Sequence, residues 1–253
     1  MLHAPLEQFQ ILAIIPFNIL SFDFSITNFL LINLLALLAY VSFIYLNSSH
    51  ENYLQENSFF LVSNAWQKSI ESISEVTTQL ISDIIVTDNE KYVPFISMLF
   101  NFILFSNLIG LIPYSFTATS HIIVTFTLSF SVFIGINLTT FAKYKMKTFS
   151  LFLPANTTFF LALLLVPIEF ISYIAKPISL GVRLFINLMA GHSLLKVIVG
   201  FSWSMLLLEN FTSIGLILPM LILVLLFGLE LGVALIQTYV FIILTCIFIQ
   251  DGS

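Results

Sequence analysis

The sequence predicts an all-α membrane protein with about five transmembrane helices and one amphipathic helix on the membrane surface. Hydrophobic residues make up 59% of the 253 residues, and charged residues make up only 8%. Long apolar stretches also recur along the chain. A soluble domain of this length could not cover its surface with so few charges, whereas a surface that faces lipid needs few. We expect residues 1–253 to form a single membrane domain.

Three stretches of ordinary length are predicted to cross the membrane, namely 24–46, 93–112 and 121–142. Residues 24–50 and 92–142 contain no Asp, Glu, Lys or Arg. About 20 residues of helix cover roughly 30 Å, which is the thickness of the hydrocarbon core. Pro113 and the polar run after it separate the second span from the third.

The stretch 58–87 predicts a helix that lies on the membrane surface. Its apolar residues recur at helical spacing, and charged residues stand between them: Lys68, Glu71, Glu75 and Asp83. One apolar and one charged face suit a helix that rests in the lipid headgroup region.

The densest basic cluster sets the predicted orientation. Lys143, Lys145 and Lys147 follow the third span, and basic loops stay on the negative side of a membrane. With five spans, the N-terminus is then predicted to lie on the opposite side.

The last hundred residues contain two apolar runs, 154–200 and 205–250, each about twice the length of an ordinary span. Pro167, Pro177 and Pro219 could kink these runs, but none is accompanied by a hydrophilic loop. We predict two long, strongly tilted helices that form a hairpin around residues 200–212.

Arg183 is the only arginine of the chain, and it lies inside the first long run. Guanidinium stays charged at any physiological pH, and its insertion at membrane depth costs about 2.5–3.5 kcal/mol. At about 100° per residue, Glu169, Ser172, Lys176 and Asn187 fall in the same narrow sector of the helix as Arg183. This polar face in an apolar helix indicates a pathway for ions that contains a fixed positive charge.

Three further polar residues belong to the long runs. His192, nine residues after Arg183, points to the opposite side of an ideal helix. Glu230 and Gln237 lie two turns apart on one face of the second run. For an intramembrane glutamate, a cavity or partner is the usual explanation. A single histidine is as often structural, and Lys176, like Lys196 and Glu209, is more often a residue that reaches the membrane surface.

Small residues occur near the charged positions, as Gly228-x-x-x-Gly232 and as Gly181 and Gly191. Small residues allow close approach of another helix. The spacing is compatible with an outside helix and with close packing between the two long helices themselves.

Several classes of function are excluded. No basic patch with interleaved aromatics indicates nucleic acid, and the four histidines lie in four different segments, which argues against haem. There is no phosphate-binding loop, no nucleophile motif and no metal-ligand spacing. Cys246 has no second cysteine with which to form a disulfide. We expect no cofactor, no metal site and no enzymatic activity of the chain alone.

The segment from Pro167 to Gly200, PIEFISYIAKPISLGVRLFINLMAGHSLLKVIVG, and the segment GLELGVALIQ at 228–237 closely resemble subunit a of the F-type ATP synthase. The run SNLIGLIPYSFTATSH and the opening PLEQFQI also resemble that subunit. The resemblance implies a stator subunit beside a rotating ring of small membrane subunits, each with one carboxylate. It also implies peripheral-stalk and other membrane-sector subunits as partners, besides lipid and protons.

The resemblance implies a role for each polar residue. Arg183 matches the essential arginine, which attracts the ring carboxylate and blocks direct passage of protons between two half-channels. The half-channel through which protons enter corresponds to His192 and Glu230, with Gln237 and Asn187 as hydrogen-bonding neighbours. The half-channel through which they leave corresponds to Glu169 and Ser172.

The residue types also indicate a compartment. Bacterial relatives usually have Glu nine residues after the arginine and His on the last helix, whereas here these positions are His192 and Glu230. This exchange resembles the mitochondrial branch and implies a multi-pass protein of the mitochondrial inner membrane. The N-terminus lacks the basic residues of an import signal, which suggests synthesis inside the organelle.

Two other functions remain open at this point. One is a self-contained, proton-coupled secondary transporter, although the two halves of the chain show no internal repeat. The other is a structural membrane anchor, which does not explain the cost of Arg183. If His192 and Glu230 form one proton relay, they must lie within about 8 Å of each other, because transfer needs hydrogen-bond reach or a connecting water.

Overall fold

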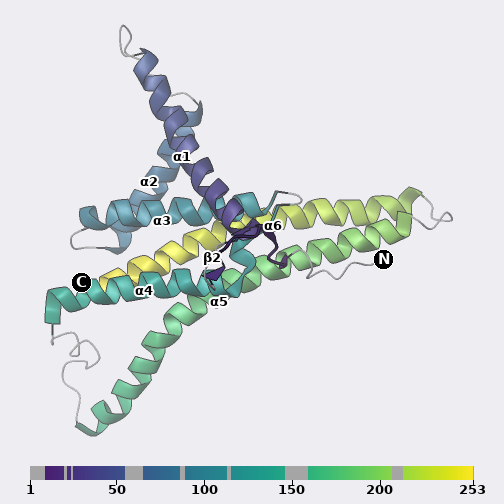
Figure 1. Cartoon of the computed structure of the whole chain (residues 1–253). Coiled ribbons are helices and arrows are strands. Elements are labelled where there is room, and N and C mark those ends of the chain that lie inside the picture. Colours follow the sequence, from purple (N-terminus) through teal and green to yellow (C-terminus); the bar gives the residue numbers. More distant parts are fainter. Residues whose placement is uncertain are drawn as a thin grey trace.

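The computed structural model describes residues 9–19, 22–23, 25–54, 65–85, 89–112, 115–145, 159–206 and 213–252. Six α-helices account for most of this part of the chain (Figure 1): α1 Asn28–Leu54, α2 Ala65–Ile84, α3 Asn89–Gly110, α4 Ile122–Tyr144, α5 Phe159–Leu206 and α6 Ser213–Asp251. A short 3-10 helix, η2 (Ala118–Ser120), precedes α4.

The predicted fold class, an all-α membrane protein whose last two helices are long, is confirmed. Among the described residues, α3, α4, α5 and α6 are long and apolar enough to cross a membrane. The shorter apolar part of α1 is Asn28–Ser42. α2 carries charged residues along one side and packs its apolar side against α3, as an amphipathic helix should.

The four long apolar helices form one layer, from which α1 projects (Figure 1). α6 packs between α5 and α3, and α4 packs against α5. The C-terminal ends of α4 and α6 meet at the same end of the molecule, where a Cβ on Gly252 would lie 2.4 Å from Thr140 Oγ1. α5 contains Pro167 and Pro177 and changes direction part-way along (Figure 1).

The core is built around α6, and α2, α3, α4 and α5 all contribute buried side chains to it. Its completely buried side chains include Ile96 of α3, Leu180 of α5 and Phe241 of α6. Thr238 and Thr245 are also buried in α6, and each hydroxyl donates a hydrogen bond to the carbonyl four residues earlier, at 2.9 Å. These bonds satisfy the threonine hydroxyls in an apolar interior. Large apolar side chains elsewhere are exposed in great number, as expected for surfaces that face lipid or other subunits.

The N-terminal region differs from the prediction, because the first helix begins at Asn28 rather than at residue 24. Short antiparallel strands precede it: β1 Ala13–Ile15 with β4 Ile26–Thr27, and β2 Asn18–Ile19 with β3 Phe22–Asp23. The Asn28 side chain accepts a bond from the Leu12 amide at 3.2 Å and donates one to the Gln10 carbonyl at 3.1 Å. These bonds tie the start of α1 to the preceding segment and fix the helix boundary there.

The two long helices also differ slightly from the predicted bounds. α5 ends at Leu206 rather than at residue 200, and α6 begins at Ser213 rather than at 205. Gly200 does not end the helix, because in an apolar environment the backbone groups are satisfied only while the helix continues. The predicted starts at 58 and 154 lie outside the described residues.

Candidate functional site

The orientation of α5 follows from its buried side. Leu180, Leu184 and Leu188 are 1–2% exposed and face the rest of the chain. At about 100° per residue, Leu184 lies about 100° round the helix from Arg183, and Leu188 about 140°. Arg183 therefore points away from the core.

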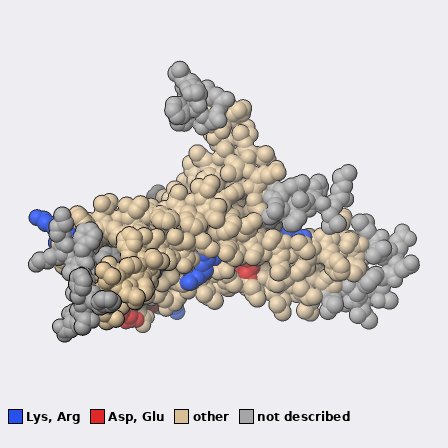
Figure 2. Space-filling model, turned by 90° about the horizontal axis from the view of Figure 1, so that it is seen from below, with Lys and Arg blue, Asp and Glu red and all other residues tan. Residues whose placement is uncertain are grey.

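Arg183 is exposed, and within the described part of the chain its guanidinium has no hydrogen bond and no ion pair. Glu169 and Ser172, which share its sector of α5, are exposed as well. The face that Figure 2 shows is mostly uncharged, with a few separate patches of basic and acidic residues. The polar face predicted from spacing thus looks outward at its Glu169, Ser172 and Arg183 positions.

Polar contacts join α5 to α6 at several levels. Lys176 Nζ lies 3.1 Å from Asp251 Oδ2, and Asn187 Nδ2 donates a 2.9 Å hydrogen bond to Gln237 Oε1. His192 Nδ1 lies 3.4 Å from Glu230 Oε1. The two helices run antiparallel, so a residue with a higher number on α5 contacts a residue with a lower number on α6.

His192 and Glu230 meet although His192 points to the side of α5 opposite Arg183. The reason is that α6 does not lie on the Arg183 side. It packs along the flank between Asn187 and His192, which are about 140° apart on an ideal helix. Asn187 and His192 therefore reach α6 from the two edges of this flank.

A glycine on α5 makes room for Glu230. A Cβ at Gly191 would lie 2.9 Å from Glu230 Oε1 and 3.2 Å from its carboxyl carbon. Any larger residue at this position would displace the carboxylate. Of the two explanations for the small residues near Arg183, close packing between the two long helices holds for Gly191. Gly181 fits neither explanation, because its Cβ would meet Ser129 Oγ of α4 at 2.8 Å. Gly228 and Gly232 instead have open space beside them.

The buried polar atoms of the hairpin have unused hydrogen-bonding capacity. Glu230 is 4% exposed, and neither of its carboxyl oxygens has a hydrogen bond among the described residues. The same is true of His192 Nε2 and of Gln237 Nε2. An unpaired buried carboxyl group costs free energy, so such groups usually serve a purpose. Next to an imidazole, this carboxyl group can take up and release protons.

Sequence reasoning missed one polar pair beside the hairpin. Asn107 of α3 is 1% exposed, and its Nδ2 donates a 3.3 Å hydrogen bond to Thr238 Oγ1, next to Gln237. Its own Oδ1 has no partner among the described residues. An asparagine in the middle of an apolar span was the available signal, because such a residue must find a partner inside the protein.

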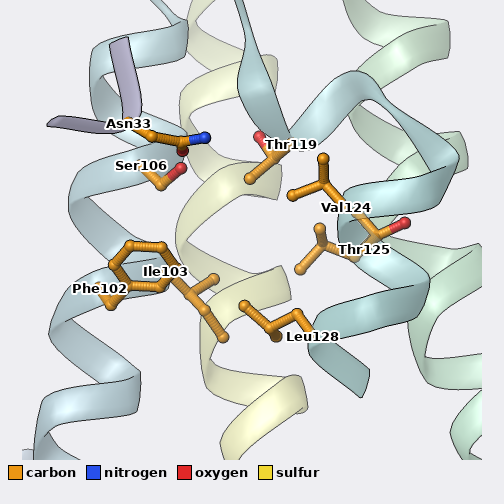
Figure 3. A pocket seen from close by; sticks show the side chains of 9 residues that line it. Asn33, Phe102, Ile103, Ser106, Thr119, Val124, Thr125 and Leu128 are labelled. Atoms are coloured by element: carbon orange, nitrogen blue, oxygen red, sulfur yellow. The ribbon is translucent and has the colours of Figure 1, made fainter. Parts of the chain in front are cut away.

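A small cavity of about 20 Å³ lies where α1, α3, η2 and α4 converge on Leu184 of α5 (Figure 3). Its wall is almost entirely apolar. None of the polar residues predicted from the sequence for the proton pathway lines this cavity.

Comparison with known proteins places the chain in a family. Residues 12–250 match the family model described as ATP synthase A chain. The chain is 47% identical to ATP synthase subunit a of Pylaiella littoralis over 252 residues, which cover 100% of this chain and 98% of the relative. It is 44% identical to the subunit a of Chondrus crispus over 98% of this chain and 95% of the relative, and 44% identical to that of Marchantia polymorpha over 98% and 97%. The chain, a multi-pass membrane protein with an outward-facing arginine and a buried carboxyl–imidazole pair, thus belongs to the ATP synthase A chain family.

Proposed function

We propose that this chain, by its family a proton-translocating subunit of the membrane sector, provides two half-channels to the carboxylates of a rotating subunit ring. It would itself be a non-catalytic part of the stator in the mitochondrial inner membrane, and it would couple proton flow to rotation and ATP synthesis. One observation supports this proposal most strongly. Arg183 faces outward without a partner among the described residues, while His192 and Glu230 meet inside the hairpin on the other side of the same helix.

The outward position of Arg183 suits a partner that brings a negative charge. An exposed cation in a membrane is costly unless a group of opposite charge approaches it. A ring carboxylate would supply that charge, and the guanidinium would hold it without ever accepting its proton. A proton that passed the arginine directly would waste about 2.3 kcal/mol for each 100 mV of membrane potential.

The pair of His192 and Glu230 between α5 and α6 is suited to the uptake of protons. Glu230 and His192 are in contact, and both retain free hydrogen-bonding atoms within the described part of the chain. Gln237 lies two turns, or roughly 10.5 Å, from Glu230 along α6, and its bond to Asn187 leads back to the Arg183 side of α5. We propose that protons reach the ring along this polar line.

The two sets of residues lie toward opposite ends of α5. Glu169 precedes Arg183 by 14 residues, roughly 21 Å of helix, and His192 follows it by nine, roughly 13.5 Å. Tyr173, four residues after Glu169, donates a hydrogen bond to Asn137 of α4, and Lys143 in the last turn of α4 is predicted to lie on the negative side of the membrane. This arrangement supports one half-channel from each side of the membrane, with Glu169 and Ser172 in the one through which protons leave.

The alternative of a self-contained transporter has less support. The family match extends over nearly the whole chain, and its relatives are named as subunits of an ATP synthase. A native gel separates the two possibilities, because a transporter would migrate alone or as a small oligomer and this subunit only within a large assembly.

The proposal is tested with reconstituted complexes that carry Arg183→Lys or Arg183→Ala. We expect ATP-driven acidification to be lost in both and passive proton leak to rise in Arg183→Ala, while the assembly stays intact. Lys196→Gln serves as the matched control, because it removes a cation from another side of α5. Unchanged pumping and leak in Arg183→Ala would refute the proposed barrier.

A further inference from the structure

The hairpin contains a second cation close to Arg183. Lys176 precedes Arg183 by two turns, roughly 10.5 Å, and lies within about 20° of it around α5. The Lys176 side chain is 40% exposed, so a partner that approaches the Arg183 side of α5 can also reach it. A free cation there would be a second attractive position for a ring carboxylate, and it would repel protons that leave past Glu169 and Ser172.

The charge of Lys176 is matched within the chain. Its Nζ forms a 3.1 Å ion pair with Asp251 Oδ2, and it lies 5.6 Å from the centre of the Phe248 ring. Asp251 is the last residue of α6. The end of α6 therefore places a carboxylate on the one cation that shares the Arg183 sector in the described part of α5. Lys196, the other lysine of that helix, lies about 220° away.

A purely structural role accounts poorly for this pair. Both side chains are 40–48% exposed, and ion pairs with that exposure contribute little to stability. The end of α6 is held in any case by apolar contacts, because Cys246, Phe248 and Ile249 are 0–4% exposed. The main effect of the pair is to neutralise the positive charge that Lys176 would otherwise present at the surface of the hairpin.

We propose that Asp251 masks the charge of Lys176, so that Arg183 is the one uncompensated cation that a ring carboxylate meets along this face of α5. This inference rests on the proposed function of Arg183. It makes Lys176 and Asp251 determinants of where the ring carboxylate stops, although neither carries protons.

The test compares single and double neutral variants in the reconstituted complex. Asp251→Asn exposes the lysine, and we expect ATP-driven acidification to fall about tenfold. Lys176→Gln together with Asp251→Asn removes both charges, and we expect acidification to return to within about twofold of the original complex. If the ion pair were needed for structure, removal of its second member would not restore acidification. Recovery of acidification in the double variant therefore distinguishes charge masking from a structural role of the pair.

Two results would overturn the inference. If the double variant pumps as poorly as Asp251→Asn, the Asp251 carboxylate itself is required, as a proton carrier would be. If the double variant fails to assemble on a native gel, the pair is a structural clasp. Arg183→Ala, measured alongside, keeps the two proposals separate. Normal pumping in Arg183→Ala refutes the proposed function, whereas failure of rescue with a defective Arg183→Ala refutes charge masking alone.

Discussion

The inner and outer sides of the α5–α6 hairpin differ in the kind of charge they carry. On the inner side, His192 and Glu230 are in contact and largely shielded. On the outer side, Arg183 is exposed and unpaired within the described residues. The titratable pair His192 and Glu230 is held inside, whereas the guanidinium of Arg183, whose charge is fixed, is exposed. Under the proposed function, the hairpin separates proton uptake from charge attraction by placing them on different sides of α5.

The largest effect is expected from Glu230→Gln. The amide keeps the shape of the side chain but cannot carry a proton, so we expect proton flow to fall by about 10²-fold or more, as for other losses of a proton-transfer group. Assembly should persist, because the change replaces a buried carboxyl group that has no hydrogen bond among the described residues. Flux in reconstituted complexes measures this, with Glu75→Gln on the exposed face of α2 as the control. Normal flux in Glu230→Gln would show that the inner side is not part of the path.

A smaller effect is expected from Gly191→Ala. The added Cβ would lie 2.9 Å from Glu230 Oε1, and a misplacement of about 1 Å can cost a reaction up to about 10²-fold. We expect a loss of about tenfold in proton flux. The control is Gly135→Ala in α4, which has open space beside it and should leave flux unchanged. If the two variants behave alike, Glu230 does not need its observed position.

Loss of the Asn187–Gln237 bond should have a weaker effect again. Removal of one member leaves a partly buried amide without its partner, at a cost of about 1–3 kcal/mol. We expect Asn187→Leu and Gln237→Leu each to lower proton flux several-fold. The double variant should be no worse than the poorer single one, because both residues act through one contact. Strictly additive losses would show that the two residues act separately.

The smallest effect on proton flux is expected from a substitution at Ser172, on the exposed side of α5 but away from Arg183. Ser172 is exposed, so water or a neighbouring subunit can replace its hydroxyl. Ser172→Ala should change proton flux by no more than about twofold. A large loss would show that this hydroxyl has a specific partner in the complex, and that the outer side depends on more than the charge of Arg183.

Several features of this protein follow from the amino-acid sequence alone. Uncharged stretches of helical length predicted the membrane fold, because a bilayer accepts only apolar helices whose backbone groups are satisfied internally. The high cost of an intramembrane charge is enough to mark Arg183, Glu169 and Glu230 as candidate functional residues. The segment around Arg183 was specific enough to indicate the family that the comparisons then showed.

Which of these groups come into contact depends on how the helices pack against one another. Spacing on an ideal helix separated His192 from the Arg183 face but could not say which flank α6 occupies. The family resemblance grouped His192 with Glu230, but helical spacing alone could not reveal their contact, the space that Gly191 provides, or the pairing of Asn107 with Thr238. It also could not show that Asp251, at the far end of another helix, compensates Lys176. Helical periodicity fixes the direction of a side chain around its own axis, whereas the packing of helices against each other fixes what that side chain faces.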